Sequence, residues 1–280
     1  MRTLNYNYQN IMYYFSKLDE ALEIYLTLHG VKPVSRIVIS EDKLKSLNDF
    51  CASIGLNFEV GSFKIINKSC IIDKESDVSG SFFVYFSKDE NLALEAKEAE
   101  EDFNDDRVGK LLGYPNCCRE FYTQNYKNAK SYGNDFAPLT HKDTVHFNFY
   151  TNNLMRYFGY ALIHHFPCRY NCIQSVKLAK EVLNLLEKDN PQMAYDIKKK
   201  LRNPIFFHKK YGVIAFDETK KENNIVHYKK PLLIAANDIY NTFNSGNNFI
   251  IGKKIIKVFK DEKLIKEFDK DVDLLAFDFS

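Results

Sequence analysis

The sequence predicts an α+β fold, because its strand-like and helix-like segments are grouped along the chain instead of alternating strictly. Short β-branched and aromatic runs surround one helical segment in residues 1–88, and residues 89–200 have mostly helical spacing of apolar side chains. Residues 201–280 return to strand-like runs and end in a β-hairpin pattern. With 280 residues, 45% of them apolar, the chain can bury a core without disulfides. We therefore expect one compact body made of a small amino-terminal α/β unit, a central helical region that bears the cysteines, and a mainly β tail.

The amino-terminal unit is predicted from a helix, strand, helix and strand pattern. Its expected elements are a helix at 13–28, a strand at 36–40, a helix at 41–55, and strands at 56–66 and 81–86. In the second helix the apolar residues recur at helical spacing, and Gly55 is the expected C-cap. Cys51 belongs to this apolar face and is interpreted as a small buried hydrophobic residue.

The central region and the tail are predicted from the same periodicities. The expected helices cover 89–106, 107–113, 117–126, 153–165 and 172–190, with a polar loop through Gly133 and Pro138. In the last of these helices, Ile173, Val176, Ala179, Leu183 and Leu186 lie along one side. The tail is expected to form strands, with a possible helix at 231–243 and a hairpin around the polar turn 260–263.

Composition and charge exclude several classes of protein. Lys and Arg number 39 and Asp and Glu 37, so the formal charge of +2 lacks the positive excess of a dedicated nucleic-acid binder. The first 20 residues lack the apolar core of a signal peptide, and no segment has the 18 apolar residues that a membrane span needs. We expect a cytoplasmic protein with a small-molecule substrate and without a nucleic-acid or membrane partner. In that reducing compartment, closely spaced cysteines are metal ligands or catalytic groups more often than disulfides.

The cysteines are unevenly distributed. The six are Cys51, Cys70, Cys117, Cys118, Cys168 and Cys172. Four of them form two tight pairs, and each pair falls at a predicted helix start. Asn116 is the expected N-cap before the first pair, and Asn171 is the expected N-cap before Cys172. The helix dipole and the amide groups of a first turn favour the thiolate, which is the form that attacks an electrophile or binds a metal.

These two pairs predict a metal site. Cys117, Cys118, Cys168 and Cys172 are the expected ligands, with His165 as a possible further ligand. Thiolates select zinc, copper(I) or iron–sulfur clusters over hard cations. Adjacent cysteines on a helix point about 100° apart, which suits a cluster with several metal corners better than one tetrahedral ion. An iron–sulfur cluster is therefore preferred to zinc, and redox or sulfur-related chemistry on a small molecule would follow from it.

Two other interpretations remain open, so the sequence does not decide whether the protein is an enzyme. In the first, Cys118 or Cys117 is the nucleophile of a metal-free acyl-transfer or hydrolysis reaction and His165 is its base. Asn152, Asn153 and Asp143 are the nearest residues that could orient this histidine. In the second, the cysteines belong to the core of a non-catalytic binding module.

The cysteine motifs also resemble those of a known family. The segments LLGYPNCCREFY at 111–122 and NNLMRYFGYALIHHFPCRYNCIQS at 152–175 resemble the prokaryotic family catalogued as domain of unknown function 483. Members carry an LGYPxCC box and an HxPCxxxC box, and the resemblance covers roughly residues 105–180. It implies that one functional unit contains Cys117, Cys118, His165, Pro167, Cys168 and Cys172, but it implies no activity, substrate or cofactor. One departure is His164 beside His165, which leaves open which histidine belongs to the motif.

One further cluster of charge stands outside these motifs. It comprises Lys198, Lys199, Lys200 and Arg202, with Lys209 and Lys210. Such a run could contact a phosphate, but its preferred interpretation is a solvated helix end. No glycine-rich dinucleotide or phosphate-binding motif accompanies it.

Overall fold

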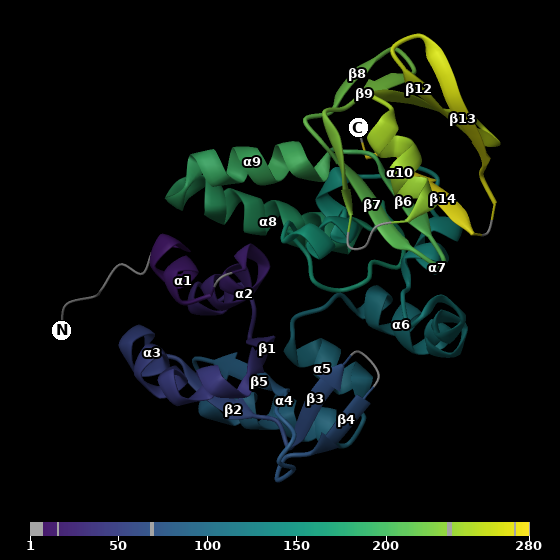
Figure 1. Cartoon of the computed structure of the whole chain (residues 1–280). Coiled ribbons are helices and arrows are strands. Elements are labelled where there is room, and N and C mark those ends of the chain that lie inside the picture. Colours follow the sequence, from purple (N-terminus) through teal and green to yellow (C-terminus); the bar gives the residue numbers. More distant parts are fainter. Residues whose placement is uncertain (1–7, 16, 68–69, 234–236, 272, 280) are drawn as a thin grey trace. The chain divides into compact units, whose positions relative to one another are not determined.

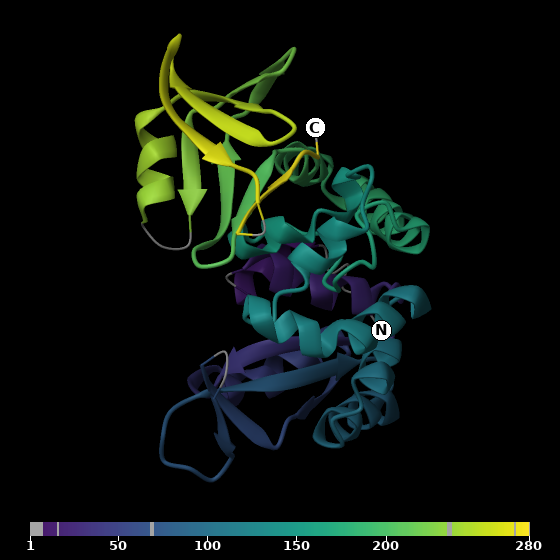
Figure 2. The ribbon, with the colours of Figure 1, turned by 90° about the vertical axis from the view of Figure 1, so that its right-hand side faces the viewer.

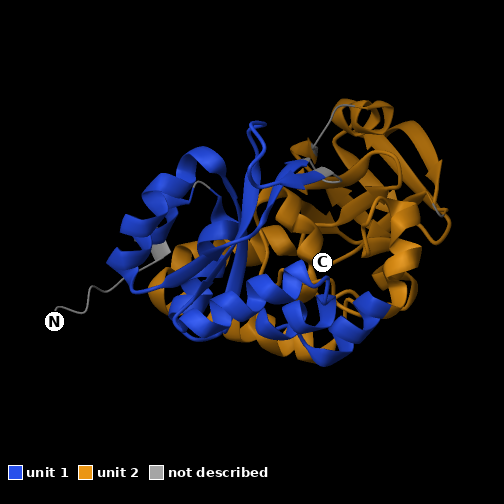
Figure 3. Cartoon of the chain, turned by 90° about the horizontal axis from the view of Figure 1, so that it is seen from below, with its two compact units in different colours: residues 1–123 blue, residues 124–280 orange. Residues whose placement is uncertain are grey.

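Helices and antiparallel strands both build this protein, which confirms the α+β class (Figure 1). The computed structural model describes all residues except 1–7, 16, 68–69, 234–236, 272 and 280. The chain divides into two compact units, residues 1–123 and 124–280, which Figure 3 distinguishes by colour. Each unit is described by itself below. Among the described residues, none of the helices combines the length and the apolar character needed to cross a membrane.

Unit 1 is built on an antiparallel sheet. Its elements in chain order are α1 (Tyr8–Tyr14), α2 (Leu18–Leu28), β1 (Val34–Ser40), the 3-10 helix η1 (Glu41–Ser46), α3 (Leu47–Ile54), β2 (Asn57–Val60), β3 (Phe63–Asn67), β4 (Cys70–Asp73), β5 (Ser81–Ser87), α4 (Glu90–Glu101) and α5 (Asp105–Leu111). Helix α6 (Asn116–Ala129) begins in this unit and continues into unit 2. Strand β5 is the centre of the sheet, because it pairs with β1, β2 and β3, and β4 extends the sheet beyond β3.

The predicted strands and the C-cap at Gly55 are confirmed, whereas the single helix expected at 13–28 is wrong. Gly55 follows α3 in the left-handed conformation, with φ of 70°. The expected helix is divided into α1 and α2, because the backbone at Lys17 is extended. Phe15, in the connection, is buried, and its ring contacts those of Phe50 and Phe86. Tertiary packing of this ring therefore outweighs the helical periodicity.

Small side chains bring the helices of unit 1 close to its sheet. Ala93, Ala96 and Ala99 form a fully buried row along α4. Two of these alanines belong to a core cluster that also contains Val34, Tyr85, Val108, Leu111 and Leu112. The side chain of Asn104 caps α5 by accepting a hydrogen bond from the amide of Arg107 (3.1 Å). This packing fixes α5 directly before the first cysteine pair.

Unit 2 combines helices with two antiparallel sheets. Its helices are η2 (Lys130–Tyr132), α7 (Ala137–Lys142), η3 (Phe149–Thr151), η4 (Asn153–Phe158), α8 (Ile173–Asp189), α9 (Pro191–Leu201) and α10 (Asp238–Ser245). Its strands are β6 (Ile205–His208), β7 (Gly212–Asp217), β8 (Lys220–Glu222), β9 (Ile225–His227), β10 (Lys230–Leu233), β11 (Asn248–Ile251), β12 (Ile255–Lys260), β13 (Lys263–Asp269) and β14 (Leu274–Phe277). The order of one sheet is β10-β7-β6-β14, and that of the other is β13-β12-β11-β9-β8.

The long helix expected at 153–165 is wrong. The chain forms only the 3-10 helix η4, which ends where Gly159 adopts a left-handed conformation with φ of 82°. Leu154, Met155 and Ile163 are nevertheless buried, as their apolar character predicts. Continuous apolar sequence thus correctly indicated burial, but it did not determine the backbone conformation.

Helices α8 and α9 form a hairpin, which Figure 1 shows as two neighbouring ribbons. The predicted helix at 172–190 is confirmed as α8, although Ile173, expected on its packed side, is 82% exposed in the first turn. The sequence analysis did not predict α9. Asn190 separates the two helices, and its side chain accepts a hydrogen bond from the amide of Met193 (3.1 Å). Pro191 then occupies the first turn, where its missing N–H is not needed.

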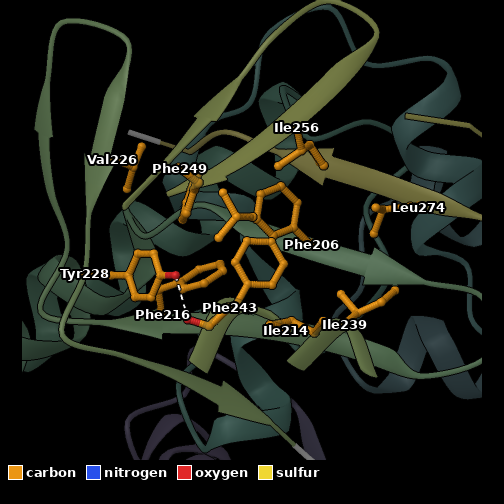
Figure 4. Packing of buried hydrophobic residues seen from close by; sticks show 12 residues of the cluster. Phe206, Ile214, Phe216, Val226, Tyr228, Ile239, Phe243, Phe249, Ile256 and Leu274 are labelled. Carbon is orange, nitrogen blue, oxygen red and sulfur yellow. Dashed lines mark hydrogen bonds between the residues drawn. The ribbon is translucent and has the colours of Figure 1, made fainter. Parts of the chain in front are cut away.

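An aromatic core packs between the strands of unit 2 and α10 (Figure 4), and Figure 2 shows the ribbon of α10 beside these strands. Phe206, Phe216, Phe243 and Phe249 are fully buried, and the hydroxyl of Tyr228 donates to the carbonyl of Phe243 (2.7 Å). The predicted hairpin is confirmed as β12 and β13. The helix proposed at 231–243 is wrong in its first part, which is strand β10, and its residues 234–236 lie outside the described residues.

Candidate metal centre

The first cysteine pair lies in the opening turn of α6. Gly113, with φ of +74°, turns the chain after α5, and the carbonyl of Pro115 accepts hydrogen bonds from the amides of Cys118 and Arg119 (both 3.0 Å). Helix α6 begins at Asn116, so the prediction that Asn116 is the N-cap is wrong. Its side chain instead contacts two side chains of the same helix, those of Arg119 and Glu120.

Arg119 connects this opening turn to α5. Its guanidinium donates to the carbonyl of Asp106 (3.0 Å) and forms an ion pair with the Asp106 carboxylate (3.2 Å). A Cβ atom at Gly109 would lie only 3.0 Å from Cδ of Arg119, so glycine provides the space for this side chain. The spacing of residues does not predict this connection, and its signal in the sequence is a glycine inside a helix, Gly109.

The second pair lies in the segment 167–172, and three threonine hydroxyls hold the backbone of this segment. The hydroxyl of Thr140 donates to the carbonyl of Pro167 (2.9 Å), and that of Thr151 donates to the carbonyl of Tyr170 (2.6 Å). The amide of Tyr170 donates to the hydroxyl of Thr144 (2.9 Å). The segment that bears the cysteines is thus held at two points of its backbone, Pro167 and Tyr170.

Cys172 occupies the N-cap position of α8, and its side chain makes no capping hydrogen bond. Asn171 lies one residue earlier, so the prediction that Asn171 caps this helix is wrong. The amide of Cys172 donates to the carbonyl of Arg169 (2.9 Å), which closes a tight turn that starts after Cys168. Cys172 therefore lies at the start of α8, as predicted, and Cys168 lies in the turn before it, but Cys172 takes the N-cap position expected for Asn171.

The four sulfur atoms form one group. The Sγ atoms of Cys117, Cys118, Cys168 and Cys172 all lie within 4.8 Å of one another. The two adjacent sulfurs, of Cys117 and Cys118, are 3.9 Å apart. Cys118 and Cys172 are buried, and the other two are partly buried. The prediction that the two pairs meet is confirmed, and four thiols at this spacing can bind a metal.

His165 is not a member of this group of four. It is 5% exposed, and its Nε2 lies 2.8 Å from the hydroxyl oxygen of Ser175. The side chain of Asn153 donates to the carbonyl of His165 (3.0 Å), and that of Asn152 donates to the carbonyl of Leu201 (2.7 Å). The two asparagines therefore hold backbone carbonyls through these bonds. Asp143, the third residue considered for orienting a histidine, is exposed at the end of α7.

Cys51 differs from the four cysteines of the group. It is 2% exposed on α3, and burial raises the pKa of its thiol to about 12. The prediction that it is a buried core residue is confirmed. Cys70 begins β4, but its side chain lies outside what the structure describes.

Comparisons with protein-family models, with curated proteins and with solved structures find no match to this chain. The resemblance of the two cysteine boxes to the domain of unknown function 483 family therefore stays a prediction.

Proposed function

We propose that Cys117, Cys118, Cys168 and Cys172 bind one metal centre through four thiolates, and that zinc is its first candidate. The observation that carries this proposal is the 4.8 Å limit on the distances between the four sulfur atoms. Thiols that serve only as small apolar core residues have no reason to gather in this way, because each thiol packs equally well against aliphatic side chains.

The spacing favours a single ion over a cluster. A tetrahedral ion with metal–sulfur distances of about 2.3 Å separates its ligand sulfurs by roughly 3.8 Å. The 3.9 Å between the sulfurs of Cys117 and Cys118 agrees with this value, and closing the group from 4.8 Å requires only small side-chain movements. In a [4Fe–4S] cluster each thiolate binds a different iron, and in a [2Fe–2S] cluster two thiolates bind each of the two irons. In both clusters the sulfurs on different irons lie further apart than four sulfurs around one ion. The adjacent cysteines in the sequence favour an iron–sulfur cluster, but the distances between the four sulfurs favour zinc, so zinc is the first candidate.

The two candidates predict different roles. Four protein thiolates fill the coordination of zinc, so a zinc centre here is structural and fixes the start of α6 to the segment 167–172. An iron–sulfur cluster is the alternative, and it would support redox or sulfur-related chemistry on a small molecule. In both cases the thiols must remain reduced, which suits a cytoplasmic location.

Metal analysis of protein purified without oxygen tests the proposal. We expect one zinc per chain without acid-labile sulfide, and cobalt-substituted protein should have the absorption bands of tetrahedral thiolate coordination. If the analysis finds iron and acid-labile sulfide in equal amounts, the centre is an iron–sulfur cluster and not zinc. Folded protein without any bound metal, unable to take up zinc or to reconstitute a cluster, would refute the proposed centre.

A matched pair of variants locates the metal. Cys168→Ala should abolish zinc binding or weaken it strongly, whereas Cys51→Ala makes the same chemical change outside the group and should leave the zinc content unchanged. Alkylation gives an independent measurement. Zinc should protect four cysteines together until a chelator is added, whereas a single hyper-reactive cysteine that chelation leaves unaffected would support the nucleophile interpretation.

A further inference from the structure

The basic cluster of the sequence lines a cavity in unit 2. The cavity has a volume of about 430 Å³ and lies between the last turns of α9 and strands β8 and β9. Lys198, Lys199 and Arg202 line it from α9 and its C-cap, and Lys221 lines it from β8. The lysines and the arginine thus come from two segments far apart in the chain, whereas a solvated helix end would involve only α9.

Two of these four cations lack a carboxylate partner among the described residues. Lys198 pairs with Glu187 (3.2 Å), and Lys221 pairs with Asp278 (2.8 Å). Lys199 makes no ion pair within the described part of the chain, and the guanidinium of Arg202 lies over the ring of Phe149 at 4.4 Å. No Asp or Glu of the described residues lines the cavity. Its walls therefore carry two positive charges, those of Lys199 and Arg202, that no ion pair of the described residues neutralises.

The two walls are held together by a buried asparagine. Asn203, 4% exposed, donates from Nδ2 to the carbonyl of Phe216 (2.6 Å). Its Oδ1 accepts a hydrogen bond from the hydroxyl of Thr219 (2.6 Å), which directly precedes β8. These bonds fix the end of α9 to the turn between β7 and β8. The backbone segments that bear the cations are consequently held together before any ligand arrives, which lowers the entropic cost of binding.

We propose that this cavity binds a small phosphate-bearing molecule, with its phosphate at Lys199 and Arg202. A phosphate dianion matches two cations that have no carboxylate partner, and a guanidinium can bind two phosphate oxygens at once. The volume lies in the range of small-molecule sites. Tyr195 and Val226 add aromatic and apolar surface for the remainder of the ligand. A phosphomonoester with a flat or apolar body, such as a mononucleotide, is the chemical class that fits.

Titration calorimetry on the full-length wild-type protein tests the proposal with inorganic phosphate and AMP as probes. We expect saturable binding of both, tighter for AMP, and none for adenosine. The double variant K199A/R202A should weaken the binding of both probes at least tenfold. Arg202→Lys keeps the charge but loses the two-pronged contact, so its affinity should fall between wild type and the double variant.

The control is K209A/K210A, which removes two positive charges from the same basic cluster but at positions that do not line the cavity. We expect it to bind both probes as the wild type does, and circular dichroism should show that all variants are folded. The proposal is overturned if the control loses affinity as much as K199A/R202A, or if chloride at equal ionic strength abolishes the binding. It is also overturned if the wild type binds neither probe saturably. None of these outcomes depends on the cysteines.

Discussion

Thr151→Val tests whether the threonine hydroxyls hold the segment that bears the second cysteine pair. Valine keeps the shape of threonine but lacks the hydroxyl, which lies 2.8 Å from the carbonyl of Asn148 and donates to the carbonyl of Tyr170 at 2.6 Å. Thr151 is fully buried, so water cannot replace this donor. The carbonyl keeps one partner, the amide of Asn148 at 3.0 Å.

The expected cost follows from these contacts. Loss of a buried hydrogen bond whose carbonyl keeps another donor costs about 0.5 to 1.5 kcal/mol. At about 1.4 kcal/mol for each factor of ten, opening of the segment should become about 2 to 12 times more frequent. Amide hydrogen exchange at Asn148 measures this directly, because its amide donates to the same carbonyl. Competition with a chelator should show faster zinc loss.

The matched control is Thr242→Val in α10. The hydroxyl of Thr242 donates to the carbonyl of Asp238 (3.0 Å) in an exposed setting, where water can take its place. This variant should change stability by less than about 0.5 kcal/mol. If exchange at Asn148 is the same in Thr151→Val, Thr242→Val and the wild type, the threonine does not hold the segment and the reasoning is wrong.

Three further predictions concern stability. Gly109→Ala should lower the melting temperature although alanine favours helices, because its Cβ would lie 3.0 Å from the Arg119 side chain. An unchanged or higher melting temperature would show that this side chain moves freely. Phe249→Ala should cost about 3 to 5 kcal/mol in urea unfolding, whereas Phe63→Ala, at a site 39% exposed, should cost much less, and equal costs would contradict the packing described for the aromatic core. Burial lowers the pKa of His141, so the unfolded chain binds the proton more readily, and stability should fall as the pH drops below about 6.5. The difference in unfolding free energy between pH 7.5 and pH 5.5 should therefore be smaller in His141→Gln than in the wild type. An unchanged difference would refute this reasoning.

Local chemistry explains how much of the site the sequence could predict. Glycine and proline before Cys117 end one helix and allow another to begin, so the first pair was correctly expected at a helix start. Cys172 was correctly expected where α8 begins, although no helix ends at the proline before Cys168. The capping residues were wrong because Pro115 and Cys172 take the positions expected for the two asparagines. A shift of one residue is within the ordinary uncertainty of helix ends.

Contacts between distant residues could not be predicted in this way. The hydroxyls of Thr140 and Thr151 donate hydrogen bonds to carbonyls 27 and 19 residues away. No pattern of spacing in the sequence predicts such a pair. Ile173 fits the apolar stripe of α8 but lies in its first turn, where it is 82% exposed. The 3-10 helix at 153–158 could not be predicted either. Apolar side chains can be buried in either helical form, so their burial does not determine which form the backbone takes.

In unit 2, the two outer strands of the sheet β13-β12-β11-β9-β8 have a consequence for the protein in concentrated solution. Strands β13 and β8 lie at its two edges, and unpaired backbone groups at such edges can recruit a strand from another molecule. Both edges carry exposed lysines, Lys263 and Lys266 on β13 and Lys220 and Lys221 on β8. A second copy approaching edge to edge would bring these ammonium groups together and strip them of water. We therefore expect the sheet to resist growth into larger β-aggregates at these two edges, which no further strand of the described residues pairs with.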